Sequence, residues 1–214
     1  MDDMADGLYE YLKANYNQNV PIFAKDIRFQ KMSPSNIRYH LAHMANKGLI
    51  AKYEPGIYYF PKEDITGAAV ALSPDNIVYD KYIRSSGDCI GFYSGYTFAN
   101  RIGLSAQVPY VKEICSNAAP APVREIMIQQ SKYILRKPPV PVTEENVNTL
   151  QLLDCLKNFD RCADEPMHTC SSILSQYCKV YKISKTMVDK YIRYYPKSVF
   201  STIYWTEVKF YVPS

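Results

Sequence analysis

The chain has no long apolar run and no leader-like N-terminus. No stretch approaches the roughly 20 apolar residues needed to cross a bilayer, so we expect no membrane association. The first residues, MDDMADGLYEYL, begin with acids and carry no basic segment ahead of an apolar run, which is not the pattern of a secretory signal. We therefore expect a cytoplasmic protein whose six cysteines remain reduced thiols.

The motifs of common enzymes are also missing. The sequence contains no G-x-x-x-x-G-K-[ST] phosphate-binding loop and no Asp-x-Asp or Asp-x-Glu pair to hold the magnesium of a nucleotidyl or phosphoryl transferase. The stretch from Gly91 to Gly95 resembles the G-x-S-x-G turn of hydrolases only loosely, because two residues separate Gly91 from Ser94. We interpret it as a strand-to-helix turn. We expect no catalytic residue, no cofactor and no enzymatic activity.

The cysteine spacing argues against a metal site. Zinc prefers thiolate and imidazole ligands, but the sequence has no C-x-x-C pair. The later cysteines recur every seven to eight residues, which returns them to one helical face, so we expect small buried hydrophobic side chains. A catalytic pair of His168 and Cys170 is disfavoured because residues two apart face different ways on a helix. The cysteines in question are Cys155, Cys162, Cys170 and Cys178.

The chain does have the composition of a globular protein with a mild positive charge. Its 214 residues, 21% of them charged, suit one large or two small domains. The net charge of +4 is weak support for a polyanionic partner, because nucleic-acid binding depends on where the charge clusters. The 20 tyrosines, against a single tryptophan, indicate half-buried polar surfaces.

The stretch from Lys31 to Lys62 begins with a helix whose two ends are specified locally. Ser33 is a good N-cap and Pro34 suits the first helical position, where its missing N–H costs nothing. Gly48 follows the last turn as a C-terminal stop. The apolar stripe of this predicted helix consists of Ile37, Leu41 and Met44.

A hairpin is expected directly after this helix. Two short strands, 49–53 and 57–60, are predicted on either side of the turn signal Glu54-Pro55-Gly56. Helix, strand, turn and strand form the second half of a winged helix-turn-helix. The first half is expected as a helix over residues 6–16 and a second short helix that starts at Pro21. The shared core is predicted to contain Ile22, Ile27, Ile37 and Leu41.

The outward face of the predicted recognition helix is rich in hydrogen-bonding groups and poor in acids. Such a helix can reach base edges, while residues at its end and on the wing hold the phosphate backbone of double-stranded DNA. The predicted DNA-binding residues are Ser33, Ser35, Asn36, Arg38, Tyr39, His43, Lys47, Lys52 and Tyr58. The alternative is a winged helix that makes protein contacts instead.

The chain is expected to divide into a winged-helix domain at 1–62, a linker at 63–72 and a mixed α+β domain at 73–214 that ends in helices. A cap-plus-proline signal, Ser73-Pro74, opens the second domain. Its expected strands are 89–93, 110–116, 123–130 and 132–136. Its expected helices are one from Ser73 to about residue 85, 94–102, one capped by Thr143 that ends near Asp160, 171–181, 184–194 and 198–206.

The C-terminal end of the chain is predicted to carry a basic surface. Two acids, Asp189 and Glu207, oppose six cations there, so this surface suits DNA or an acidic protein. The alternative is an ordinary solvated helix face. The six cations are Lys179, Lys182, Lys185, Lys190, Arg193 and Lys197.

Three blocks of the sequence resemble the AbiEi-type antitoxins of bacterial type IV toxin-antitoxin systems. The blocks are MSPSNIRYHLAHMANKGLIAKYEPGIYYFPK, GFYSGYTFANRIGLSAQVPYVKEICSN and ILRKPPVPVTEENVNTLQLLDCL. They cover most of residues 5 to 160. The middle block is the more specific, through Tyr93-Ser94-Gly95, Ala99-Asn100 and Gln107-Val108-Pro109, since winged helices alone are very common.

The resemblance implies a winged helix that binds promoter inverted repeats and represses its own operon. It also implies a C-terminal domain that counters a nucleotidyltransferase toxin without a stable complex, helps the protein form a homodimer or cooperate on DNA, and acts in defence against phage. The alternative from another class is an orphan winged-helix regulator whose C-terminal domain dimerises or senses a ligand. An enzyme acting on nucleic acid would need a cluster of acids, cysteines or histidines that the spacing does not reveal.

Overall fold

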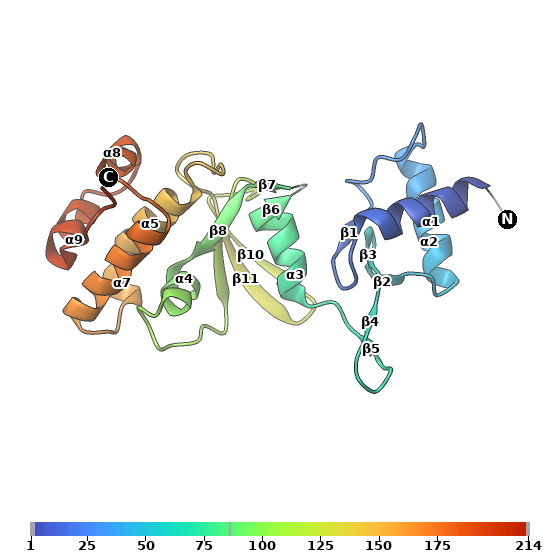
Figure 1. The fold of residues 1–214 in the computed structure, drawn as a ribbon, viewed down its shortest axis with the longest axis horizontal. Coiled ribbons are helices and arrows are strands. Elements are labelled where there is room, and N and C mark those ends of the chain that lie inside the picture. Colours follow the sequence, from blue (N-terminus) through green and yellow to red (C-terminus); the bar gives the residue numbers. More distant parts are fainter. Residues whose placement is uncertain (1–2, 86, 213–214) are drawn as a thin grey trace. The chain divides into compact units, whose positions relative to one another are not determined.

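A computed structural model describes residues 3–85 and 87–212 of the chain and divides it into two compact units, Met1–Asp80 and Lys81–Ser214. Within these described ranges the chain is an α+β protein with nine α-helices and four small sheets, and it ends in helices (Figure 1). The expected α+β class is therefore confirmed. None of the helices in the same ranges is long and apolar enough to span a membrane.

The first unit combines two main helices with a three-stranded sheet of order β1-β3-β2, in which both pairs of strands are antiparallel. Its elements are α1 (Asp3–Asn15), β1 (Ile22–Phe23), α2 (Pro34–Asn46), β2 (Ala51–Glu54), β3 (Ile57–Tyr59), β4 (Lys62–Glu63), β5 (Ala69–Val70) and α3 (Pro74–Val78). A single apolar core joins α1, α2 and the sheet, and it contains all four predicted core residues. These are Ile22, Ile27, Ile37 and Leu41.

Helix α2 begins and ends where the sequence predicts. The Ser33 side chain accepts a hydrogen bond from the backbone N–H of Asn36, and Pro34 is the first helical residue. At the other end Gly48 has a φ of +74°, its N–H donates to the carbonyl of Ala45, and the N–H of the next residue donates to Met44. This pair of bonds is a Schellman motif, which satisfies the last carbonyls of the helix.

The predicted second helix, starting at Pro21, is wrong. Ile22 and Phe23 form strand β1 instead and pair with β3, and residues 24–32 continue as turns. The Arg28 guanidinium donates to the carbonyls of Lys25 and Ile27, which stabilises this turn. The apolar residues of this stretch have a spacing that suits a short strand and a turn as well as a short helix, so periodicity could not separate the alternatives.

Residues 63–72, expected as a linker, contain part of a small exposed hairpin. Strands β4 and β5 pair antiparallel, with Lys62 opposite Val70 and Glu63 opposite Ala69. The helix expected from Ser73 is present as α3, capped by the Ser73 hydroxyl, and continues as the π-helical turn η1 (Tyr79–Ile83) across the boundary between the units.

The second unit is built on a mixed four-stranded sheet of order β10-β11-β9-β8, in which β11 and β9 run parallel. Its strands are β6 (Arg84–Ser85), β7 (Asp88–Cys89), β8 (Gly91–Ser94), β9 (Lys112–Ser116), β10 (Val123–Ile128) and β11 (Ser131–Arg136). Its helices are α4 (Gly95–Ile102), α5 (Val147–Lys157), α6 (Phe159–Cys162), α7 (Met167–Val180), α8 (Lys185–Tyr191), the 3-10 turn η2 (Ile192–Tyr194) and α9 (Ser198–Thr206).

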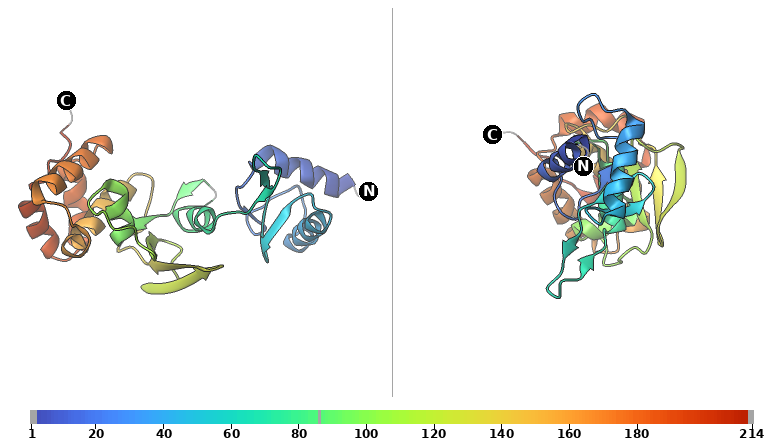
Figure 2. Two further views of the ribbon diagram at one scale, coloured as in Figure 1. Left: turned by 90° about the horizontal axis from the view of Figure 1, so that it is seen from below. Right: turned by 90° about the vertical axis from the view of Figure 1, so that its right-hand side faces the viewer.

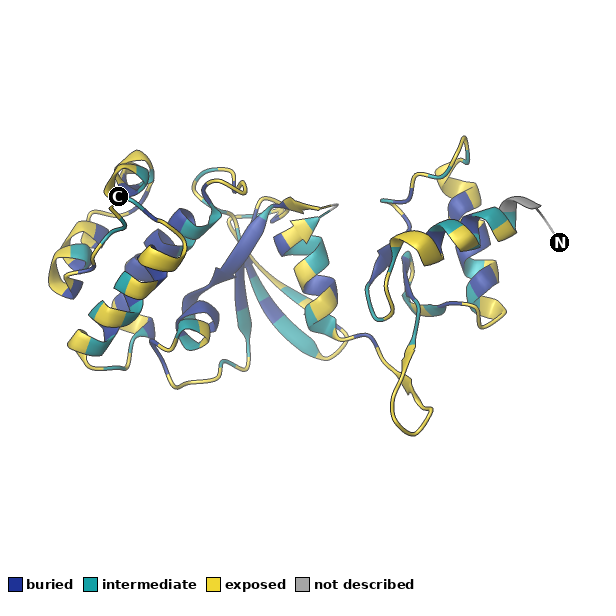
Figure 3. Cartoon of the chain, viewed as in Figure 1, coloured by how far each residue is buried: buried dark blue, intermediate teal, exposed yellow. Residues whose placement is uncertain are grey.

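The helices of this unit gather around β8, which is buried along its whole length (Figure 3). Helices α4 and α5 pack against β8, and α7, α8 and α9 lie beyond them, on the side away from the β10–β11 hairpin (Figures 1 and 2). The predicted strands and the three terminal helices are confirmed. Thr143 is not the N-cap, however: α5 begins one turn later at Val147, and the Asn146 side chain accepts from the N–H of Thr143 and donates to Pro141.

Candidate nucleic-acid interface

Helix α2 presents a continuous polar face to solvent. Its apolar side is buried in the core of the first unit, and its polar side chains are exposed because they lie on the opposite side of the same helix. The Ser33 hydroxyl, which caps the helix, also lies 3.0 Å from that of Ser35. The exposed predicted residues on this face and at its two ends are Ser33, Ser35, Asn36, Arg38, Tyr39, His43 and Lys47.

Tyr39 is the most prominent side chain of this face. It is 67% exposed, and its ring stacks parallel to that of His43, with the two ring centroids 6.3 Å apart. The ring of His40, which is buried, meets Tyr39 edge-on at 5.3 Å. Contacts on two sides limit the rotamers of Tyr39, so a large amphipathic side chain is held outward at low entropic cost.

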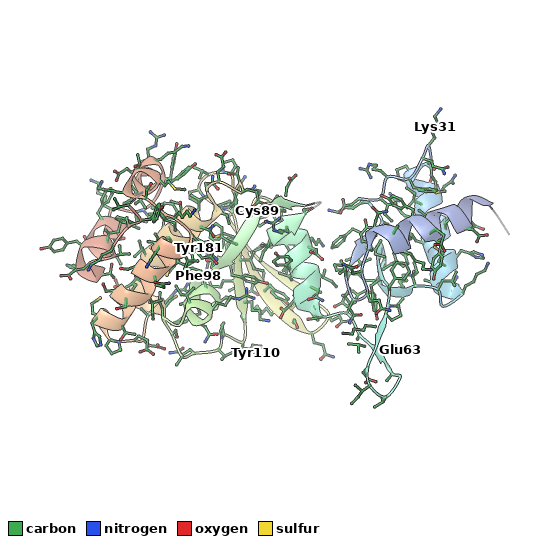
Figure 4. All side chains as sticks on the ribbon, viewed as in Figure 1. Lys31, Glu63, Cys89, Phe98, Tyr110 and Tyr181 are labelled. Atoms are coloured by element: carbon green, nitrogen blue, oxygen red, sulfur yellow. The ribbon has the colours of Figure 1, made fainter. Side chains whose placement is uncertain are left out.

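The charge around α2 is locally positive although the first unit as a whole is not. Between Val20 and Tyr53 the only acid is Asp26, against six cations. Lys31 projects from the turn that precedes α2 (Figure 4). Clustered positive charge of this kind attracts phosphate and releases counterions. The six cations are Lys25, Arg28, Lys31, Arg38, Lys47 and Lys52.

The hairpin β2–β3 contributes less than the sequence predicts. Lys52 is exposed on β2, in keeping with a contact to a phosphate backbone. Tyr58 on β3 is only 4% exposed and belongs to the core of the first unit, so its predicted role at the DNA surface is wrong. All three residues of β3 are buried, and Tyr58 packs into the apolar core that joins α1, α2 and the sheet.

The six cations predicted at the C-terminal end are all exposed in the second unit. Lys185 pairs with Asp189 at 2.6 Å on α8, and the guanidinium of Arg193 donates to the Tyr194 hydroxyl at 3.0 Å. Lys190 lies over the ring of Tyr191. Tyrosine rings thus lie beside cations of this basic surface, in keeping with the richness of this end of the sequence in both lysine and tyrosine.

Two buried carboxylates in the second unit were missed by the sequence predictions. Glu113 on β9 is 4% exposed and accepts hydrogen bonds from Arg136 on β11 at 3.1 Å and from Arg161 on α6 at 3.2 Å. Asp154 on α5 accepts from the hydroxyl of Ser94 at 2.6 Å and from Lys157. An acid within an otherwise apolar strand or helix face was the available signal, since charges are buried only when paired.

Ser94 and Gly95 form the predicted strand-to-helix turn between β8 and α4. Gly95 has a φ of +52°, and a Cβ atom there would overlap the Glu113 carboxylate and lie 2.9 Å from the guanidinium of Arg161. The Ser94 hydroxyl is engaged by Asp154. The turn therefore brings β8 and α4 into contact with buried charges on β9, α5 and α6. Among the described residues no group of three Cys, His, Asp or Glu side chains is arranged to hold a metal ion.

All six cysteines are free and buried, and burial raises the pKa of their thiols, to about 12 for Cys115 and Cys178. A raised pKa lowers the thiolate fraction, and the thiolate is the reactive form. We expect no prompt reaction with a thiol reagent at about pH 8 in the native protein and reaction of all six after unfolding, as measured by absorbance. A rapidly reacting native thiol would contradict this.

No family model matches the chain, and no curated protein matches it.

Proposed function

We propose that the first unit is a winged helix-turn-helix that binds double-stranded DNA through α2. The observation that carries this proposal is the exposed, acid-free polar face of α2, set in a helix, strand, helix and hairpin order with the sheet order β1-β3-β2. Strand β1 and the turns and loop over residues 24–32 take the place of the second helix expected between α1 and α2. The capped ends of α2 support the proposal, because a recognition helix needs fixed ends to hold its register.

The side chains of α2 suit readout in the major groove. A helix of 13 residues is about 20 Å long and fits that groove. Arg38 supplies a bidentate donor for guanine, and Asn36 supplies the donor and acceptor that adenine requires. Lys47 after the helix and Lys52 on the hairpin reach phosphates, which gives affinity without sequence information.

We further propose that the chain is an autorepressor and antitoxin of a type IV system, with the second unit countering a nucleotidyltransferase toxin. The support is the resemblance of the three sequence blocks to AbiEi-type antitoxins. In addition, a nucleotidyltransferase needs a pair of acids to hold magnesium, and the sequence has no Asp-x-Asp or Asp-x-Glu pair, which fits the antitoxin of the system and not the toxin. The second candidate is an orphan regulator with the same DNA-binding unit. The basic surface of the second unit is compatible with both the antitoxin and the orphan regulator.

The binding proposal is tested with DNA from upstream of the chain's own gene. We expect the full chain to bind its inverted repeats, and Arg38→Ala with Tyr39→Ala to weaken binding by about a hundredfold, since a good base contact contributes about 1 to 3 kcal/mol. Fluorescence anisotropy at physiological salt measures this. The matched control changes an exposed arginine and tyrosine of the second unit, Arg124→Ala with Tyr110→Ala. Equal affinity of all three proteins would refute the proposal.

Co-expression with the neighbouring gene separates the antitoxin from the orphan regulator. If the chain is an antitoxin, we expect the wild-type protein to restore growth of cells that express the neighbouring toxin gene. We expect the Arg38→Ala and Tyr39→Ala double variant to restore growth as well, when both genes are driven by unrelated promoters. Failure of both proteins to restore growth favours the orphan regulator.

A further inference from the structure

Helix α9 has an outward face that is dominated by aromatic rings. Its inward residues Val199, Thr202 and Thr206 are buried where α9 packs against α5 and α7. At 100° per residue the opposite half of the helix carries three rings. Their exposures are 54% for Phe200, 80% for Tyr204 and 60% for Trp205.

The rings of this face do not take part in the packing of the unit to the extent that the buried side of α9 does, because each of them is more than half exposed. Exposed apolar side chains scattered singly are ordinary, but three large exposed rings within six residues of one helix are an unusual concentration of apolar surface. Phe200 and Tyr204 are neighbours at i and i+4, and Trp205 lies on the other flank of the same outward half. The chain has no other tryptophan.

The charge next to this face is positive. Lys197 caps α9 and falls, by helical position, between the two flanks of the aromatic face. Arg193 lies four residues earlier with its guanidinium over the ring of Tyr194, and the α9 segment itself contains no acid, although the exposed Glu207 follows it as the C-cap. Two copies of this surface would bring like charges together, which disfavours self-association through α9.

We propose that the outward face of α9, together with Lys197 and Arg193, binds single-stranded nucleic acid. Exposed rings that lie next to cations form stacking platforms on which unpaired bases rest while lysine and arginine neutralise the backbone. A duplex hides the faces of its bases, so this surface discriminates against it. The site is separate from α2, and its occupancy does not depend on the function proposed for the first unit.

The test uses the full chain and the fluorescence of Trp205. Titration with oligo(dT) and oligo(U) of about 12 nucleotides should quench the fluorescence, since a stacked base contacts the indole directly. The affinity should fall as salt rises and should exceed that for a blunt duplex of equal charge by about tenfold or more. Phe200→Ala with Tyr204→Ala keeps the reporter and should weaken binding by about tenfold or more.

Two controls keep the outcomes distinct. Tyr110→Ala removes an exposed ring of the same unit away from α9, and it should leave the quenching unchanged. The Phe200 and Tyr204 variant should still bind the duplex inverted repeats if α2 holds them. Absent quenching, equal quenching by duplex, or quenching by polyglutamate but not by oligonucleotides would overturn the proposal, the last result pointing to an acidic protein partner.

Discussion

Replacing Gly91 with alanine should lower the free energy of unfolding by about 3 kcal/mol or more, the cost of forcing atoms into a closely packed site. A Cβ atom at this position would overlap the backbone carbonyl oxygen of Tyr82 and lie 2.5 Å from that of Cys115. Backbone atoms cannot step aside as a side chain can, because Cys115 belongs to the central strand β9, which pairs with β8 and β11. Urea denaturation of the full chain, followed by circular dichroism, measures the effect.

Gly103→Ala is the matched control in the same unit. Gly103 ends α4 with a φ of +83°, and an added Cβ atom would meet only Ile173 at an ordinary distance of 3.9 Å. We expect a cost of about 1 kcal/mol, the usual penalty for a side chain in the left-handed region. If Gly91→Ala lowered the free energy of unfolding by no more than this control does, the conclusion that the backbone around Gly91 leaves no room for a side chain would be contradicted.

Replacing Glu113 with glutamine should be nearly as damaging, at about 2 to 3 kcal/mol. The side chain keeps its size but loses the charge that two arginines share, and a broken buried ion pair typically costs about 3 to 5 kcal/mol. We expect less than that range because the side chains of Arg136 and Arg161 are 31% and 45% exposed and regain water. The same denaturation measurement applies.

Glu125→Gln provides the comparison on the same sheet. Glu125 on β10 pairs with Lys132 on β11 at 2.7 Å, but both side chains are well exposed to solvent. Exposed ion pairs contribute about 0 to 1 kcal/mol, so this variant should be close to wild type. Equal losses for Glu113→Gln and Glu125→Gln would mean that the buried cluster does not hold β9, β11 and α6 together.

The sequence predicted those parts of the fold that depend on local backbone chemistry. Ser33, Pro34 and Gly48 specify both ends of α2 by groups within a few residues, and the same holds for Gly103 after α4. The exposure of the predicted α2 residues follows from the same helical periodicity. Strands of the central sheet were also predicted, because their apolar runs are bounded by turn residues.

What could not be predicted depends on partners distant in the sequence. Strand β1 exists because Ile22 and Phe23 pair with β3 some 35 residues later, and a two-residue strand has no periodicity of its own. The burial of Tyr58 follows from its packing against core residues of α1 and α2, which are distant in the sequence. An acid within an apolar segment marks Glu113 and Asp154 as unusual, but the partners that stabilise their burial, Arg136 and Ser94, are distant in the sequence and could not be identified from it.

The central claim is that α2 lies in the DNA groove, and a tethered cleavage reagent tests it most directly. Every native cysteine is buried, so Asn46→Cys introduces a single reactive thiol on the exposed side of α2. An iron chelate attached there should cut the bound promoter fragment within the inverted repeat, whereas the same chelate at Gln176→Cys on α7 should not. Full binding without cleavage from position 46, or equal cleavage from position 176, would contradict the account.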